Sequence, residues 1–312
     1  MNLLQNPVFT RHVRKTPLLP LIESKNLLCK LECCQAGGSF KIRGSLSTLL
    51  DLAARGDKKG VITASMGNTA SGLAYAGKLF HYPVAVVMPE TVSATKLAAT
   101  RRIGAEVILK GQVGDEALKH AFKLAQERNI LFVHPHKTLP FLEGNATIAR
   151  EIVEDNPGVE QIYIPIGGGG LASGIAGYFK SNDNDDKIEI IGCQPEHSPV
   201  MFQSVKAGRI IEMESKPTLS DGTTGGIEAG SITFDICKET LDDYILVSEK
   251  EIAEAIQLVL ERHYMVIEGA AALSVASFIK TKERFKNKNV VLIITGKRIT
   301  PDKLKKIICK EK

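Results

Sequence analysis

Four consecutive glycines, Gly167, Gly168, Gly169 and Gly170, are the most distinctive candidate for chemistry in this 312-residue sequence. They follow an apolar, β-branched run and precede a helical pattern that begins at Leu171. A backbone without side chains can wrap around an anion, and the amides and dipole at the start of a helix favour a phosphate there. Because a tight turn needs only one or two glycines, the run predicts a phosphate-binding loop.

A lysine stands among small residues in the segment GSFKIRG, between Phe40 and a predicted helix. A desolvated lysine amine is a nucleophile and forms a Schiff base with an aldehyde. An isolated Lys41 would more often be a surface cation. Together with a phosphate loop, it favours a cofactor that carries both an aldehyde and a phosphate, which is pyridoxal phosphate.

Two further candidate segments lie at the carboxyl ends of predicted strands. In the segment 65–72, SMGNTASG, the backbone amides can bind a substrate carboxylate and the Asn68 side chain can donate to a phenolate oxygen. Capping of the helix by Ser65 or Asn68 explains this segment equally well. Thr295 closes an apolar run, and its hydroxyl can either bind a ring nitrogen or cap the strand.

The glycine run also matches the pattern GxGxxA, and Glu196 lies close to the position of a ribose-binding acid in a nucleotide fold. A nicotinamide enzyme is therefore a competing interpretation. It leaves Lys41, Asn68 and Thr295 without a role.

The elements that must position these residues alternate between strands and helices. Strands are predicted in two sets, at 60–64, 83–87, 106–109 and 130–133, and at 161–166, 187–193, 244–247 and 289–294. The helical patterns between them include 67–79, 115–128, 171–180, 249–263 and 269–280. This alternation is typical of parallel sheets and predicts an α/β protein with two doubly wound domains. Ligands bind beyond the carboxyl ends of such strands, where the candidate residues fall.

The composition excludes several classes of protein. With 44% hydrophobic residues, 24% charged residues and a net charge of +5, the chain is globular. Residues 280–312 include twelve basic and three acidic side chains, which we interpret as a solvated face rather than a nucleic-acid site. The six cysteines form no CxxC pair, and no apolar run suits a signal sequence or a membrane span. We expect a cytoplasmic protein without membrane or nucleic-acid partners.

In this order, the segments resemble the fold-type II pyridoxal-phosphate enzymes, and GSFKIRG is similar to the threonine and serine dehydratase branch that includes serine racemase. The resemblance extends from 16 to 296 and includes 134–147, Asp221-Gly222 and 267–270. It implies a tryptophan-synthase-β-like fold with a pyridoxal-phosphate cleft between two domains. The large cofactor-binding domain would comprise 1–48 and 136–312, and the small substrate-carboxylate domain would comprise 49–135. A homodimer is also expected.

The resemblance implies a role for each motif residue. Lys41 is the Schiff-base lysine, Asn68 contacts the phenolate oxygen and Thr295 meets the pyridine nitrogen. The other implied cofactor-binding residues are Phe40, Gly167, Gly168, Gly169, Gly170 and Leu171. The implied substrate-binding residues are Ser65, Met66, Gly67, Thr69, His136 and Gly222.

The implied activity is the deamination of a small β-hydroxy amino acid, such as L-threonine or L-serine, by α,β-elimination of water. Lys41 takes the α proton, and the products are a 2-oxo acid and ammonia. In serine racemase a serine before the Gly-Asn pair acts on the opposite face of the substrate, and Met66 at that position cannot exchange a proton. A β-replacement transferase of the cysteine-synthase type, an amino-acid racemase and a non-catalytic pyridoxal-phosphate-binding protein are the alternatives.

Several departures from the family pattern concern the substrate and the metal. His136 stands where a small polar or aromatic residue is common in the family. Two interpretations are open: His136 selects a hydroxyl or carboxylate on the side chain of the substrate, or it is an ordinary polar residue of the pocket wall. Gln194 stands where many relatives have the glutamate of a cation site, so no metal is expected. Because the chain ends seventeen residues after Thr295, we expect no additional regulatory domain and no control by isoleucine.

Overall fold

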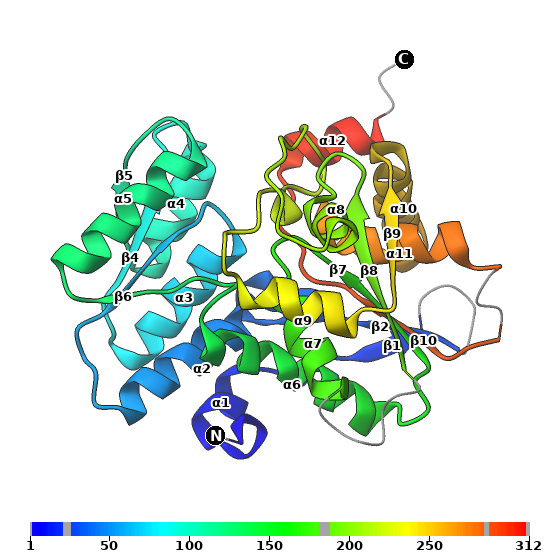
Figure 1. The fold of residues 1–312 in the computed structure, drawn as a ribbon, viewed down its shortest axis with the longest axis horizontal. Helices are drawn as coiled ribbons and strands as arrows, with labels where there is room; N and C mark the ends of the chain where they lie inside the picture. Colours follow the sequence, from blue (N-terminus) through cyan, green and yellow to red (C-terminus); the bar gives the residue numbers. More distant parts are fainter. Residues whose placement is uncertain (1, 21–25, 181–187, 284–286, 310–312) are drawn as a thin grey trace. The chain divides into compact units, whose positions relative to one another are not determined.

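A computed structural model describes residues 2–20, 26–180, 188–283 and 287–309. The chain forms two compact units (Figure 1). Unit 1 comprises Met1–Val13 and Lys41–Gly144, and unit 2 comprises Arg14–Phe40 and Asn145–Lys312. The predicted small domain, 49–135, falls within unit 1. The chain passes from unit 2 to unit 1 between Phe40 and the candidate lysine, Lys41.

Unit 2 contains a six-stranded sheet with the order β1-β2-β10-β7-β8-β9. All neighbours are parallel except β1 and β2. The strands are β1 (Leu18–Pro20), β2 (Leu27–Lys30), β7 (Gln161–Pro165), β8 (Glu189–Pro195), β9 (Asp243–Val247) and β10 (Val290–Ile293). The second predicted set of strands matches β7 to β10, although Lys187 at the start of one prediction lies outside the described residues.

Both faces of this sheet are buried. Side chains alternate along a strand, so Ile162 and Ile164 of β7 pack in one core with α7, whereas Tyr163 packs in a second core with α10 and α11. The helices of unit 2 are α7 (Gly170–Lys180), α8 (Val200–Ala207), α9 (Ile232–Thr240), α10 (Glu249–His263), α11 (Gly269–Thr281) and α12 (Pro301–Ile308). Short 3-10 turns occur at η2 (Glu32–Cys34), η3 (Ala36–Gly38) and η4 (Asp221–Thr223).

Unit 1 contains a parallel four-stranded sheet with the order β5-β4-β3-β6. Its strands are β3 (Val61–Ala64), β4 (Val84–Met88), β5 (Glu106–Leu109) and β6 (Leu131–Phe132). Its helices are α1 (Pro7–His12), α2 (Lys41–Ala54), α3 (Asn68–Phe80), α4 (Ala94–Ile103) and α5 (Gly114–Glu127), after the turn η1 (Leu3–Gln5). Helix α6 (Leu139–Asp155) begins in unit 1 and ends in unit 2. The predicted α/β class with parallel sheets is confirmed.

A buried ion pair lies inside unit 2. Lys30 Nζ is 2.7 Å from Glu151 Oε2, and the two side chains are 0% and 2% exposed. The same ammonium group donates to the Thr16 carbonyl at 2.8 Å. Removal of either partner would leave a charge in a low-dielectric interior, so this pair ties α6 to β2.

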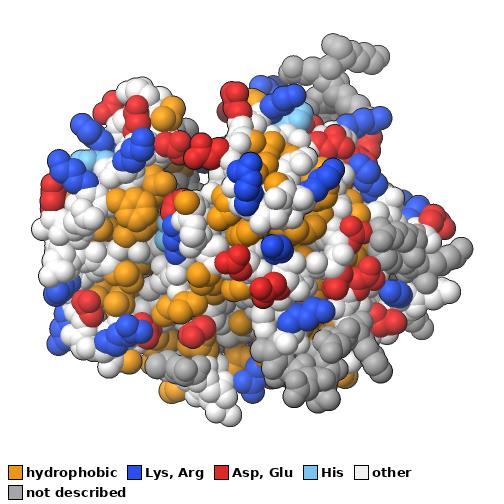
Figure 2. Space-filling view, in the orientation of Figure 1, with side chains coloured by type: hydrophobic (Ala, Val, Ile, Leu, Met, Phe, Trp, Pro, Cys, Tyr) orange, Lys and Arg blue, Asp and Glu red, His pale blue; other side chains and the backbone are white. Residues whose placement is uncertain are grey.

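Several cations of the basic stretch 280–312 are paired with acidic side chains. Among the described residues, the ion pairs of this stretch include those of Lys280 with Glu251 and Glu196, of Lys288 with Glu189 and of Lys303 with Asp221. On the face drawn in Figure 2, the basic and acidic side chains are interspersed. Among the residues that the structure describes, no helix combines the length and apolar character needed to cross a bilayer.

Candidate active site

The sheet of unit 2 brings two candidate segments to one edge. Strands β7 and β10 are parallel neighbours, with Leu292 opposite Tyr163. Their carboxyl ends therefore meet at the same edge, where β7 continues into the glycine run and β10 continues into Thr295. Parallel α/β sheets bind ligands at this edge.

The glycine loop runs closer to its neighbours than a side chain would allow. A Cβ on Gly167 would lie 2.9 Å from Thr223 Cα. Gly169 has a φ of +84°, and a Cβ there would lie 2.8 Å from Met201 Cε and 3.0 Å from Thr233 Cβ. The positive φ therefore favours glycine at position 169, and a Cβ there would require Met201 and Thr233 to shift.

Two carbonyl groups of the loop are held by the protein. The Thr233 hydroxyl donates to the Gly168 carbonyl at 2.7 Å, and the Asn145 Nδ2 group donates to the Gly170 carbonyl at 3.0 Å. Asn145 and Thr233 are both fully buried. With these carbonyls bound to protein donors, the backbone amides at the start of α7 are suited to bind an anion.

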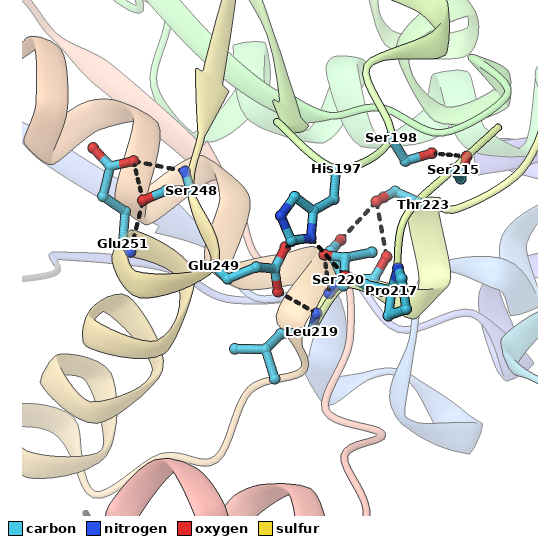
Figure 3. A network of polar contacts seen from close by, with 11 residues as sticks. His197, Ser198, Ser215, Pro217, Leu219, Ser220, Thr223, Ser248, Glu249 and Glu251 are labelled. Atoms are coloured by element: carbon cyan, nitrogen blue, oxygen red, sulfur yellow. Dashed lines mark hydrogen bonds and ion pairs between the residues drawn. The ribbon is translucent and has the colours of Figure 1, made fainter. Parts of the chain in front are cut away.

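A polar network holds the segment that packs on the glycine loop (Figure 3). His197 Nδ1 donates to the Pro217 carbonyl at 2.6 Å, and the Leu219 amide donates to Glu249 Oε2 at 2.6 Å. Because the Pro217 carbonyl oxygen can only accept a hydrogen bond, the His197 ring carries a proton on Nδ1. The network fixes η4, which carries the candidate Gly222 and also Thr223.

Thr295 lies beside the residues that precede the candidate lysine. Ser39 and Gly296 form an antiparallel bridge, and the Phe40 amide donates to the Thr295 carbonyl at 3.1 Å. Phe40 is 6% exposed and packs in one core with Ile166 and Leu171. Unit 2 by itself therefore brings together the glycine loop, Thr295 and Phe40, the residue that precedes Lys41.

A carboxylate lies behind Thr295. The Thr295 hydroxyl donates to Glu268 Oε1 at 3.3 Å, and the Arg298 amide donates to Glu268 Oε2 at 3.1 Å. Thr295 and Glu268 are 3% and 6% exposed. Glu268 belongs to the segment 267–270, which the sequence singled out without assigning the glutamate a role.

Lys41 is the first residue of α2 in unit 1. A Cβ on Gly72 would lie 3.1 Å from the Lys41 carbonyl oxygen, so α2 and α3 approach closely at their first turns. The ammonium group lies 5.8 Å from the centre of the Phe141 ring, within the range of a cation–π contact. Lys41 thus begins a helix that packs beside the one starting at Asn68.

The sheet of unit 1 also collects its candidates at one edge. Strands β3 and β6 are parallel neighbours, so the segments after them, 65–68 and 133–136, lie close together. Gly67 is the N-cap of α3 and has no side chain to cap the helix, while its amide donates to the Ser65 hydroxyl at 3.2 Å. Thr69 is 6% exposed and Met66 is 38% exposed. The first turn of α3 is suited to bind a carboxylate.

His136 is a neutral imidazole next to Lys41. Burial, and then the positive charge of Lys41, lower the pKa of His136 well below its ordinary value, with smaller effects of His134 and Lys137. The His136 amide donates to His134 Nδ1 at 3.2 Å, and the two rings lie edge to face with centres 5.1 Å apart. A neutral ring can donate or accept a hydrogen bond but carries no charge for a carboxylate.

One amide and one acid that were considered for other ligands have protein partners. The Gln194 Nε2 group donates to the Ile166 carbonyl at 3.2 Å, and Gln194 Oε1 accepts from the Phe202 amide at 2.8 Å. Glu196 pairs with Lys280 at 3.7 Å. Within the described ranges, no group of three His, Cys, Asp or Glu side chains has the arrangement of a metal site.

Comparison with known proteins identifies the family. Residues 9–296 match the family described as pyridoxal-phosphate dependent enzymes. The chain belongs to this family. It is 38% identical over 307 residues to L-threonine ammonia-lyase of Thermotoga maritima, a match that covers 98% of this chain and 76% of the relative.

Solved structures of family members share the fold. Processed threonine deaminase isoform 2 from Solanum lycopersicum superposes with a TM-score of 0.90 at 31% identity, covering 99% of this chain and 91% of that chain. Maize serine racemase superposes with a TM-score of 0.87 at 26% identity, covering 96% and 93%. The resemblance to fold-type II pyridoxal-phosphate enzymes is confirmed, and the cofactor of the family is pyridoxal phosphate.

The residues of unit 2 fit this cofactor. A phosphate needs several backbone donors and no intruding side chain, and the glycine loop leaves no room for a Cβ at positions 167 and 169. A pyridine ring needs a polar partner at its nitrogen, and the buried Thr295 hydroxyl lies at the same edge of the sheet.

Proposed function

We propose that this chain is a pyridoxal-phosphate-dependent ammonia-lyase that converts L-threonine or L-serine into a 2-oxo acid and ammonia. The observation that carries the proposal is the edge of the unit 2 sheet, where the glycine loop, Thr295 and Phe40 converge. The relative from Thermotoga maritima is named L-threonine ammonia-lyase, which supports the same activity.

In this proposal, the backbone of Gly167, Gly168, Gly169 and Gly170, with Leu171 and Phe40 packed beside it, holds the cofactor. Asn68 would donate to the phenolate oxygen, and Thr295 would contact the ring nitrogen. Bound pyridoxal phosphate supplies an electron sink for the charge that develops at the α carbon.

Lys41 holds the cofactor in the resting enzyme and then, as a free amine, accepts the α proton of the substrate. Ser65, Met66, Gly67 and Thr69 form the turn that binds the substrate carboxylate at the start of α3. Because Met66 has no proton to exchange, it cannot act as the acid or base on the face of the substrate opposite Lys41, which disfavours racemisation by that route.

His136 and Gly222 are assigned to the wall around the substrate side chain. The neutral His136 ring suits the β-hydroxyl group of threonine or serine better than a second carboxylate. L-threo-3-hydroxyaspartate should therefore be a poorer substrate than L-threonine.

The proposal includes a homodimer in a reducing compartment, the cytoplasm. All six cysteines are free, which suits such a compartment. Closed symmetric dimers are common among soluble enzymes. Light scattering of the purified protein measures the oligomeric state directly.

The first experiment supplies the purified protein and pyridoxal phosphate with L-threonine, L-serine or L-threo-3-hydroxyaspartate and measures ammonia and 2-oxo acid. Lys41→Ala should lose turnover and the cofactor absorbance shift, whereas Lys123→Ala, which changes a lysine with a 71% exposed side chain, should keep both. Absence of release from all three amino acids by protein with bound cofactor would refute the lyase. Release only after addition of a thiol or amine would instead identify a β-replacement enzyme.

A further inference from the structure

Three sulfur-containing side chains, Cys33, Cys34 and Met265, form a sulfur cluster inside unit 2. Cys33 Sγ lies 3.9 Å from Met265 Sδ. Cys34 follows Cys33 in η2, and all three side chains pack in the core that contains Tyr163. Leu171, which follows the glycine run, packs in the core on the other face of the sheet. The sulfur cluster therefore lies apart from the glycine loop and has no role in the activity proposed above.

Regular elements hold the sulfur cluster in place. The Cys33 amide donates to the carbonyl of Ile294, the residue after β10, at 3.0 Å. Met265 follows Tyr264, the left-handed C-cap residue of α10. The end of a strand and the end of a helix thus fix the two sulfur atoms at their short separation. A ligand that needs both atoms would find them already in position.

The sulfur cluster can be reached by a small ion. Cys33 is only 1% exposed, but Cys34 and Met265 are half-buried. An ion can therefore approach the buried thiol beside its two partly exposed neighbours. An entry path of this kind is one requirement of a metal site.

Cys33 and Cys34 are poorly placed to form a disulfide with each other. Consecutive Cα atoms lie about 3.8 Å apart across a trans peptide, whereas the two Cα atoms of a disulfide are usually about 4.4–6.8 Å apart. Both cysteines are free in the structure. The pair is therefore a stable dithiol, and a thiophilic metal ion is a better ligand for it than an oxidant.

The spacing and number of the sulfur atoms fit a three-coordinate ion. A bond between a metal and a thiolate is about 2.3 Å long, so two ligands of a flat three-coordinate site lie about 4.0 Å apart and those of a linear site about 4.6 Å. The observed spacing is 3.9 Å. A tetrahedral zinc site would need a fourth ligand. Among the described residues, no group of three His, Cys, Asp or Glu side chains could hold a metal ion.

We propose that Cys33, Cys34 and Met265 bind the soft monovalent cation Cu(I) through two thiolates and one thioether. Thiolate and thioether ligands select Cu(I) over harder divalent ions. Binding forms three metal–sulfur bonds and releases the two thiol protons to solvent, without a change in the oxidation state of copper or sulfur. The proposal does not depend on the lyase activity.

The charges around the sulfur cluster suit a monovalent cation. Burial, and then the adjacent Cys34 thiol, raise the pKa of Cys33 to about 12, whereas the positive charge of Lys297 lowers it and Glu32 adds a smaller increase. The unliganded thiol is therefore protonated and a poor nucleophile. Cu(I) with two thiolates carries one net negative charge, which the charge of Lys297 stabilises.

The experiment titrates the reduced holoenzyme with Cu(I) in the absence of oxygen, in competition with the coloured chelator bicinchoninate. Cys309→Ser is the starting protein, because Cys309 is exposed and would compete for Cu(I). We expect the protein to withdraw one equivalent of Cu(I) from the chelator. X-ray absorption at the copper edge should then show three sulfur neighbours at about 2.3 Å.

Two further variants, made in the same starting protein, test the ligands. Met265→Leu removes the thioether with little change in side-chain volume, so the affinity for Cu(I) should fall by at least about 10-fold and one sulfur neighbour should disappear. Cys34→Ser removes a thiolate and should lower the affinity by more than about 100-fold. The matched control is Met213→Leu, which changes a half-buried methionine of the other core and should alter neither quantity.

Failure of the starting protein to withdraw Cu(I) from the chelator overturns the proposal without any further variant. Cu(I) binding that is equally tight in Met265→Leu, Cys34→Ser and the control also overturns it, because the ion would then be bound elsewhere. Cys34 and Met265 are half-buried, so these substitutions test the site without changing the fully buried Cys33. Urea unfolding of each variant, compared with the starting protein, verifies that the fold is retained.

Discussion

The glycine loop can be tested with one methyl group. Gly169→Ala places a Cβ on a backbone with a φ of +84°, and the left-handed conformation costs about 1–2 kcal/mol for a residue with a side chain. The new atom would also lie 2.8 Å from Met201 Cε, 3.0 Å from Thr233 Cβ and 3.1 Å from Cys237 Sγ. Overpacking of this kind costs about 1–3 kcal/mol. The free energy of unfolding should fall by about 2–5 kcal/mol.

Cofactor affinity should fall as well. The Thr233 hydroxyl binds the Gly168 carbonyl, so displacement of Thr233 also moves the loop. Loss of one amide contact to the phosphate, worth about 1.5–3 kcal/mol for a charged acceptor, would weaken pyridoxal-phosphate binding by about 10- to 100-fold. Urea unfolding of the cofactor-free protein gives the first quantity, and a fluorescence titration with pyridoxal phosphate gives the second.

Gly177→Ala is the matched control, because Gly177 lies in α7, the helix that follows the loop, and a Cβ there meets nothing within 4 Å. Alanine is the better helix former by about 1 kcal/mol, so this variant should unfold at an equal or higher urea concentration and bind the cofactor normally. If Gly169→Ala behaves like Gly177→Ala in both assays, neither the backbone nor the packing requires a glycine in the loop.

Two predictions concern charge. Because the pKa of His136 is lowered, the folded protein binds fewer protons than the unfolded chain below about pH 6.5, and the free energy of unfolding should fall as the pH drops through this range. His136→Gln should reduce that slope by up to about 1.4 kcal/mol per pH unit, and parallel profiles for variant and parent would contradict the assignment. Lys30→Met removes the ion-pair partner of the buried Glu151 and should cost about 3–5 kcal/mol in urea unfolding. Lys15→Met removes only surface pairs, so its cost should stay below about 1 kcal/mol, and equal losses for the two variants would argue against the buried pair.

Most of the strands and helices could be predicted from local sequence patterns. The predicted strands at 60–64, 83–87 and 106–109 coincide with β3, β4 and β5 to within one residue at each end, because short runs rich in β-branched residues between helical patterns favour strands. The sequence did not predict β1 and β2. β1 contains Pro20 and is an edge strand, and β2 is a four-residue strand whose parallel partner, β10, is distant in the chain. Their strand character comes from tertiary pairing rather than from local preference.

The site shows the same division between local and long-range information. The glycine loop and Lys41 can be recognised from the sequence because each is a short motif with its own chemistry. The roles of Asn145 and Thr233 in holding the loop carbonyls, and of Glu268 behind Thr295, arise where distant segments meet. A buried polar residue acquires such a role only from the fold, and its residue type alone does not indicate it.

The pairing of β2 with β10 has a consequence for synthesis of the chain. Leu27 pairs with Val290, so β2 leaves the ribosome long before its parallel partner exists. Unit 1, in contrast, is complete as soon as Gly144 has been made, and domains generally fold as units during synthesis. We expect unit 1 to fold first while β1 and β2 form an unfinished edge, the kind of surface that chaperones shield. The edge that collects the glycine loop and Thr295 forms only when β10 joins the sheet.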